Sequence, residues 1–177
     1  MSTILTSKAD CRDCYKCIRY CPVKAIGLKD GQAWVVEEKC ILCGQCIVVC
    51  PQHAKSTVSQ LPLLEKYLRN GERVIVSLAP SYLATSFFST PWKLVAALKK
   101  AGIFRIEETI LGAQPVAAEY GKLMREMREG TIITSCCPVT VNIIEKYFPS
   151  LVPSLSQIIS PMVAHAKQIK AQWGEQT

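Results

Sequence analysis

A doubled run of cysteines is the feature that most restricts what this sequence can fold into. The chain has 177 residues, and ten of them are cysteine. Eight of the ten form two runs of the pattern C-x2-C-x2-C-x3-C-P: Cys11, Cys14, Cys17 and Cys21, then Cys40, Cys43, Cys46 and Cys50. The second run follows the first with a 29-residue period. This spacing is typical of chains that bind two 4Fe–4S clusters, in which the fourth cysteine of each run binds the other cluster.

The spacing also predicts which thiolates share a cluster. Three cysteines at three-residue intervals on a tight loop can each reach a different iron atom, and a thiolate from elsewhere completes the set. We therefore assign two sets of ligands, Cys11, Cys14, Cys17 and Cys50 to one cluster and Cys40, Cys43, Cys46 and Cys21 to the second. The alternative is two structural zinc sites, but these use cysteine pairs that are well separated in sequence.

Composition and charge indicate the compartment and the kinds of partner that we expect for the chain. No apolar run reaches the roughly 18–20 residues of a membrane span, and the first ten residues lack the apolar core of a secretory signal. We therefore expect a soluble, cytoplasmic protein without disulfides. The formal net charge is +7, and two oxidised cubanes of roughly −2 each would lower it to about +3. We expect no nucleic-acid partner.

The first third of the chain resembles a bacterial-type two-cluster ferredoxin across roughly residues 4–57. Residues 33–36, Ala-Trp-Val-Val, are the short strand expected between the two halves. We expect an α+β ferredoxin-like domain with two 4Fe–4S clusters in residues 1–58, a connecting helix and linker in 59–72, and an incomplete α/β domain with a parallel sheet in 73–177.

The second part of the sequence alternates between helical and strand patterns. We expect helices at 61–70, 91–101, 116–128, 138–147 and 161–173, and strands at 73–79, 103–107 and 131–134. Such βαβ units form parallel sheets, and chemistry gathers beyond the carboxyl ends of their strands. Residues 79–81 and 135–138 fall at these ends. Here Cys136 and Cys137 are either plain buried thiols or one metal ligand beside one free thiol.

Thr134-Ser135-Cys136-Cys137-Pro138 resembles the first signature of the catalytic domain of iron-only (FeFe) hydrogenases. The resemblance implies that Cys137 holds the cubane half of the H-cluster, a 4Fe–4S cluster joined to a di-iron centre. It also implies that the Cys136 thiol relays protons to the di-iron centre. The pocket residues that it implies are Ser81, hydrogen-bonded to a cyanide ligand, Ala79, Pro80 and Pro161 in the wall, and Ser156 on the proton path.

The activity that this resemblance implies is the reversible conversion of protons and electrons into H2. The electrons would come from a soluble carrier, either a ferredoxin-like protein or an NAD-linked subunit. The sequence differs from the family's pattern at Val139-Thr140, at Met162 and at Glu119, which stands alone where the family has an acidic pair. These differences also fit a second function, that of a hydrogen sensor. Three further cluster cysteines of the family are absent, so we expect a truncated catalytic domain, with an H-cluster only in a complete protein. A stand-alone ferredoxin-type carrier is the remaining alternative.

Overall fold

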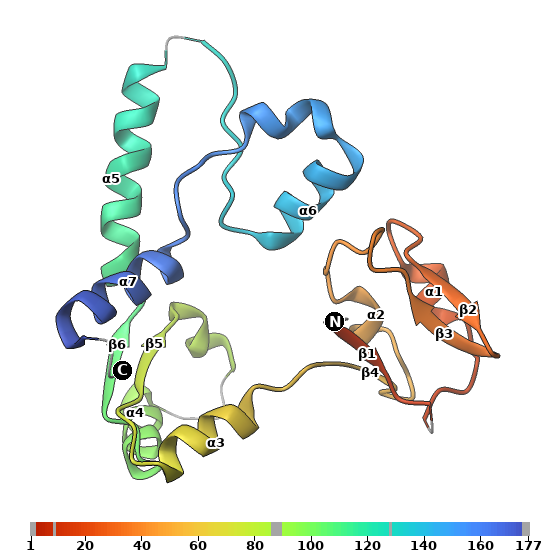
Figure 1. The fold of residues 1–177 in the computed structure, drawn as a ribbon, viewed down its shortest axis with the longest axis horizontal. Coiled ribbons are helices and arrows are strands. Elements are labelled where there is room, and N and C mark those ends of the chain that lie inside the picture. Colours follow the sequence, from red (N-terminus) through yellow and green to blue (C-terminus); the bar gives the residue numbers. More distant parts are fainter. Residues whose placement is uncertain (1–2, 9, 86–89, 128, 175–177) are drawn as a thin grey trace. The chain divides into compact units, whose positions relative to one another are not determined.

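The computed structural model describes residues 3–8, 10–85, 90–127 and 129–174 (Figure 1). The chain divides into two compact units. Unit 1 comprises Met1–Ser59 and Cys137–Leu155, and unit 2 comprises Gln60–Cys136 and Ser156–Thr177. A segment from the later part of the sequence therefore belongs to the same unit as both cysteine runs.

Unit 1 is built from two antiparallel strand pairs and short helices. Its elements are β1 (Ile4–Thr6), α1 (Lys16–Tyr20), β2 (Ile26–Lys29), β3 (Gln32–Val35), α2 (Gln45–Val48), β4 (Lys55–Thr57), α6 (Pro138–Tyr147) and the 3-10 helix η2 (Pro149–Ser154). β1 pairs with β4, and β2 pairs with β3. Between β2 and β3, Asp30 and Gly31 have φ values of 53° and 70°, the left-handed pair that a two-residue hairpin turn requires. The strand expected at residues 33–36 is confirmed as β3.

The core of unit 1 combines aliphatic side chains with cysteine thiols. Its buried members are Ile4, Cys17, Cys21, Ala25, Ile26, Ala33, Val35, Cys40 and Cys46. Both cysteine runs thus contribute sulfur atoms to one apolar interior, where the thiols lie out of water.

Unit 2 contains the parallel strand pair that the sequence predicts. Its elements are α3 (Leu61–Arg69), β5 (Ile75–Leu78), the 3-10 helix η1 (Pro80–Thr85), α4 (Pro91–Lys100), β6 (Arg105–Glu108), α5 (Ile110–Glu126) and α7 (Pro161–Trp173). β5 and β6 pair in parallel with α4 between them in sequence. The expected helices α3, α4, α6 and α7 and the expected strands β5 and β6 are confirmed.

Two expectations for this part of the chain are wrong. Residues 131–134 form an isolated bridge at Ile133 rather than a strand. Helix α5 begins at Ile110, six residues before the expected start, and it contains Pro115. A proline inside a helix lacks an N–H and crowds the preceding turn, but packing of the first turn of α5 against α7 outweighs that cost. The expected last helical residue, Arg128, lies outside the described residues.

Helices α5 and α7 cross at a glycine. A Cβ atom added to Gly112 would lie 2.2 Å from the Pro161 carbonyl oxygen and 2.6 Å from the His165 backbone nitrogen. This spacing allows only a hydrogen atom at that position of α5, so the glycine sets the distance between the two helices.

A buried polar network joins α7 to both strands. The His165 side chain is 1% exposed; its Nδ1 lies 2.8 Å from the Ser77 hydroxyl and its Nε2 lies 3.1 Å from Glu107 Oε2. Ser77 Oγ also lies 2.7 Å from the Thr109 hydroxyl. Burial raises the pKa of Glu107, but hydrogen bonds from Arg105 and His165 outweigh that effect and hold it below its ordinary value. His165 is thus a hydrogen-bonded core residue.

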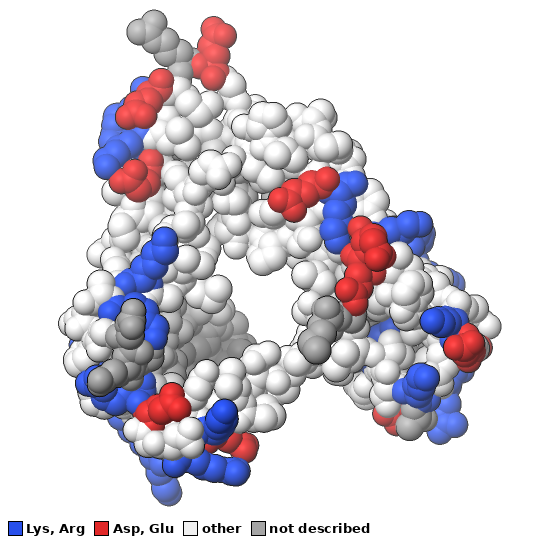
Figure 2. Space-filling model, in the orientation of Figure 1, with Lys and Arg blue, Asp and Glu red and all other residues white. Residues whose placement is uncertain are grey.

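Charged side chains of both signs are scattered over the face of the molecule drawn in Figure 2. Within the described part of the chain, no helix has the length and apolar character needed to cross a membrane.

The crossing at Gly112 gives a first prediction. Gly112→Ala should destabilise the chain by about 1–3 kcal/mol, because its methyl group overpacks the contact with α7. The midpoint temperature of thermal unfolding should then fall by several degrees. Gly121→Ala in the same helix is the matched control, since its Cβ would meet only the end of the Arg125 side chain, at 3.4 Å. The control should be neutral or up to about 1 kcal/mol stabilising. Equal unfolding temperatures for the two variants would contradict the close-packing argument.

Candidate functional site

A cavity in unit 1 brings together three neighbouring cysteines of the first run and one cysteine of the second run. Cys11, Cys14, Cys17 and Cys50 all line it. The first three lie in and just before α1, and Cys50 follows α2. These are the four residues that the spacing assigns to one cluster, and the fourth of them comes from the second run.

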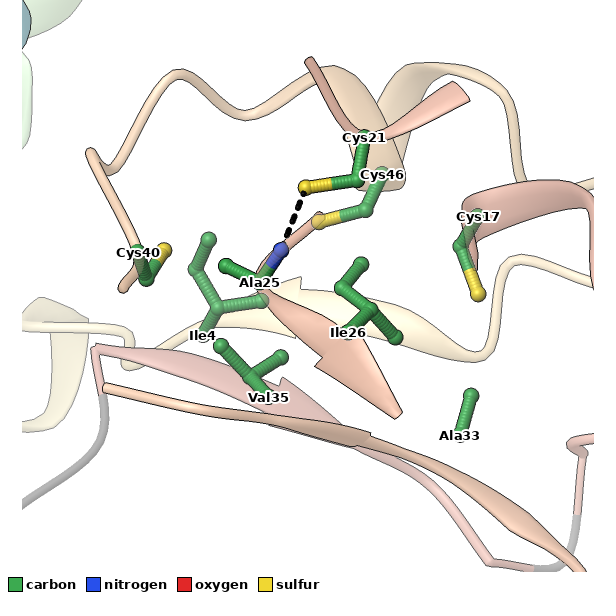
Figure 3. Packing of buried hydrophobic residues seen from close by; sticks show 9 residues of the cluster. All are labelled: Ile4, Cys17, Cys21, Ala25, Ile26, Ala33, Val35, Cys40 and Cys46. Atoms are coloured by element: carbon green, nitrogen blue, oxygen red, sulfur yellow. Dashed lines mark hydrogen bonds between the residues drawn. The ribbon is translucent and has the colours of Figure 1, made fainter. Parts of the chain in front are cut away.

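The other four cysteines are less completely gathered around one space. Cys21, Cys40 and Cys46 are buried, whereas Cys43 is exposed. Burial raises the pKa of Cys46, and the nearby Cys40, Cys17 and Cys43 thiols raise it further. Figure 3 shows Cys21 and Cys46 above the apolar side chains of the core and Cys40 to one side of them, beside Ile4.

The four cysteines that line the cavity fit a group that is larger than a single ion. The ligands of a cubane each bind a different iron atom and so surround a volume. A cavity lined by four cysteines and otherwise mostly by neutral residues fits such a group.

The backbone of the two runs repeats an unusual conformation. Among the described non-glycine residues, six have positive φ: Asp13, Tyr15, Lys24, Asp30, Leu42 and His53. Five of these, with Gly44 at φ 73°, form three pairs related by the 29-residue repeat: 13 with 42, 15 with 44, and 24 with 53. A left-handed conformation is unfavourable for residues with a Cβ, so its repetition at equivalent positions marks loops whose shape is constrained in the same way.

Backbone N–H groups point at sulfur in both halves. The Ala25 N–H donates to Cys21 Sγ at 3.2 Å, a bond drawn in Figure 3, and the Ala54 N–H donates to Cys50 Sγ at 3.3 Å. The two bonds are related by the 29-residue repeat. Hydrogen bonds to ligand sulfur stabilise negative charge there, and they are among the features that set cluster potentials.

Burial and one cation act on the interior thiols. Burial raises the pKa of the Cys17 and Cys46 thiols, and the Lys55 ammonium opposes this effect at both residues. Lys55 opens β4 and also lines the cavity of four cysteines. Sequence reasoning missed this lysine, although the repeat contains a signal for it.

Helix α6 contacts the second run through its last two residues, which sequence reasoning also missed. Lys146 Nζ donates to the carbonyl oxygens of Glu37 at 2.9 Å and Cys40 at 2.7 Å. The Tyr147 hydroxyl donates to the Lys39 carbonyl oxygen at 2.7 Å. The side chains at the end of α6 thus satisfy carbonyl groups of the chain that leads to Cys40.

Cys137 occupies the other end of the same helix. It is the N-cap of α6, and the N–H groups of Thr140 and Val139, with the Thr140 hydroxyl, hold the pKa of its thiol below the ordinary value. A thiol favoured as thiolate at a helix N-terminus is suited to binding a metal. Cys136 and Cys137 are both exposed, so the alternative that they are plain buried thiols is wrong.

The remaining predicted pocket residues lie in unit 2. Ala79, Pro80 and Ser81 follow β5 and are exposed. Ser156 is buried, and its N–H donates to the Ile133 carbonyl oxygen at 2.9 Å. Pro161 is the first residue of α7. Residues 79–81 thus lie at the carboxyl end of a parallel strand, as the sequence pattern predicts.

Two family models match the chain. Residues 10–55 match the 4Fe-4S dicluster domain. Residues 72–177 match the C-terminal domain of the iron-only hydrogenase large subunit.

Two hydrogenase subunits are among its relatives. The NADP-reducing hydrogenase subunit HndD of Solidesulfovibrio fructosivorans is 30% identical over 141 residues, 69% of this chain and 24% of the relative. The periplasmic Fe hydrogenase large subunit of Nitratidesulfovibrio vulgaris is 31% identical over 173 residues, 88% of this chain and 41% of the relative. This chain therefore spans less than half the length of either subunit.

A shorter match is to a protein of another kind. The polyferredoxin-like subunit of the aliphatic sulfonate oxidoreductase of Pyrococcus furiosus is 46% identical over 39 residues, 21% of this chain and 22% of the relative.

The cysteine runs and these matches define an iron-sulfur electron-transfer protein with a ferredoxin-type 4Fe–4S domain. Because the hydrogenase model covers more than half of its residues, the chain belongs to the iron-only hydrogenase large-subunit family. The predicted cytoplasmic location stays a prediction.

The lowered pKa of Cys137 can be measured. In the cluster-loaded chain with Cys136→Ser, the rate of Cys137 alkylation by iodoacetamide should reach half its maximum at a lower pH than for an ordinary thiol. Adding Thr140→Val removes one donor to the thiolate, so the midpoint should move to higher pH, as peptide mass spectrometry would report. Thr134→Val is the control and should leave the midpoint unchanged. An unchanged midpoint in Thr140→Val would show that the Thr140 hydroxyl does not lower the pKa of Cys137.

Proposed function

We propose that the chain holds two 4Fe–4S clusters, one on Cys11, Cys14, Cys17 and Cys50 and one on Cys40, Cys43, Cys46 and Cys21. The observation that carries the proposal is the cavity that places Cys50 of the second run with the first three cysteines of the first run. A cubane held by four thiolates accepts and releases one electron. The chain surrounds it with sulfur ligands, N–H donors and apolar side chains.

The proposed role is electron transfer between a carrier and an H-cluster in reversible H2 oxidation and proton reduction. The carrier is either ferredoxin-like or an NAD-linked subunit, in keeping with the name of the HndD relative, an NADP-reducing hydrogenase subunit. Only Cys136 and Cys137 lie outside the two runs, so an H-cluster needs thiolates beyond the ten that this sequence contains.

The other residues that the hydrogenase resemblance points to have the proposed supporting roles. Cys137 binds the cubane half of the H-cluster as thiolate, and its lowered pKa supports this. Cys136, with an exposed thiol, holds and passes a proton at Sγ. The proposed pocket roles are hydrogen bonding for Ser81, wall positions for Ala79, Pro80 and Pro161, and a proton-path position for Ser156.

Iron content with paired cysteine variants tests the cluster assignment. The anaerobically reconstituted chain should contain about eight irons and give the EPR signals of two reduced cubanes. Cys11→Ala with Cys50→Ala removes two ligands of one proposed cluster, so about four irons should remain. Cys40→Ala with Cys50→Ala removes one ligand from each cluster, so both should be lost.

The matched pair of double variants separates the two ligand arrangements. If each run instead bound its own cluster, the Cys40 and Cys50 variant would keep about four irons and the Cys11 and Cys50 variant would lose both clusters. Zinc in place of iron in the unsubstituted chain would refute the proposed function altogether.

A further inference from the structure

Lys55 is the one Lys or Arg that is buried among the residues the structure describes. Its side chain is 4% exposed, at the start of β4. Burial of a charged group is costly unless an opposite charge or a set of hydrogen bonds compensates for the lost water. A partner for this ammonium group is therefore expected inside unit 1.

The protein partners of Lys55 are neutral. Its Nζ donates to the Thr6 hydroxyl and, at 3.2 Å, to the Ala33 carbonyl oxygen. None of the ion pairs between described residues includes Lys55, and an ammonium group has three N–H donors. Asp13 lines the same cavity, but none of the described carboxylates lies within ion-pair distance of the Lys55 ammonium group.

The internal repeat shows that the fold does not require a lysine at this position. The 29-residue period that relates Cys21 to Cys50 also relates Ile26 to Lys55. Ile26 opens β2 as Lys55 opens β4, and Ile26 is buried to a similar degree, at 6% exposed. Since an aliphatic side chain fills the equivalent site in the other half, the charge of Lys55 has a role apart from packing.

The position of Lys55 relates it to both cysteine runs. It lines the cavity of four cysteines that includes Cys17. Its strand, β4, also contacts α2, the helix that carries Cys46. Cys17 and Cys46 belong to different ligand sets, so this buried cation lies in a strand that adjoins both sets.

We propose that Lys55 is the shared internal counter-ion of the two clusters and that it raises the reduction potential of both. This inference rests on the proposed function, since it requires two clusters in unit 1. On reduction, each oxidised cubane takes one electron, and its charge with four thiolates changes from roughly −2 to about −3. A fixed positive charge in a low-dielectric interior stabilises the more negative form.

The test is an EPR-monitored redox titration of the reconstituted full chain, with dithionite as the electron donor. Lys55→Ile, which places in the second half the residue found in the first, should lower both potentials. We expect about a tenfold fall in each one-electron reduction equilibrium constant, which corresponds to about 59 mV. Lys55→Arg keeps the charge and should keep both potentials near those of the unsubstituted chain.

Lys29→Gln is the matched control, because Lys29 is an exposed lysine in β2 of the same unit. Its charge is screened by solvent and salt, so its removal should shift the potentials far less. Lys55→Ile with both clusters and unchanged potentials would overturn the proposal, and so would a shift of only one cluster.

Loss of clusters from Lys55→Ile also has a defined meaning. Lys55→Gln and Lys55→Arg would then be compared for iron content. Retention in the arginine variant alone would support a counter-ion, whereas loss in both would show a packing role and overturn the proposal. The iron content of the unsubstituted chain is a separate check, since fewer than about eight irons there would refute the proposed function itself.

Discussion

Both cysteine runs of unit 1 pack against one small apolar core, and most of the local structure follows from that constraint. Cys50 lines the same cavity as Cys11, Cys14 and Cys17, so ligands from the two ends of the ferredoxin-type region meet. A group bound there closes a loop of about 40 residues and restricts the unfolded chain as a cross-link does. Metal binding in that cavity would therefore stabilise the fold of this unit, and the β1–β4 pair joins the two ends of the same region through the backbone.

The two halves of the 29-residue repeat share their backbone conformation but differ in some of their side chains. Left-handed residues recur at equivalent places in both loops, as at Asp13 and Leu42, and so do the N–H donors to the last cysteine of each run. Such agreement is expected where two loops must wrap the same kind of group. A difference in a buried side chain cannot be explained by that shared geometry, and the pairing of Ile26 with Lys55 is the clearest such place. A repeat is therefore a source of functional information as well as of fold information.

The sequence predicted the chemistry of the site better than its charge environment. Ligand spacing is a local pattern, and helix and strand periodicity predicted α3, α4, α6, α7 and the parallel pair. The early start of α5 was not predictable, because it depends on packing between Gly112 and a helix that comes much later in the chain. The strand expected at 131–134 failed for a similar reason, since a strand needs a neighbour that pattern alone does not supply. Because buried lysines are rare, Lys55 looks in the sequence like any exposed lysine, and only the fold shows that it lies in the interior.

Helix α6 gives this family member a fixed link between its two kinds of cysteine. Cys137 caps its N-terminus, while Lys146 and Tyr147 at its C-terminus bind carbonyl groups next to the second cysteine run. Because the helix has several turns of regular backbone and both of its ends belong to unit 1, it holds the Cys137 thiol at a set distance from the loop of Cys40. In the proposed function, where Cys137 binds a cluster, a helix anchored at the second run would keep the distance for electron transfer constant.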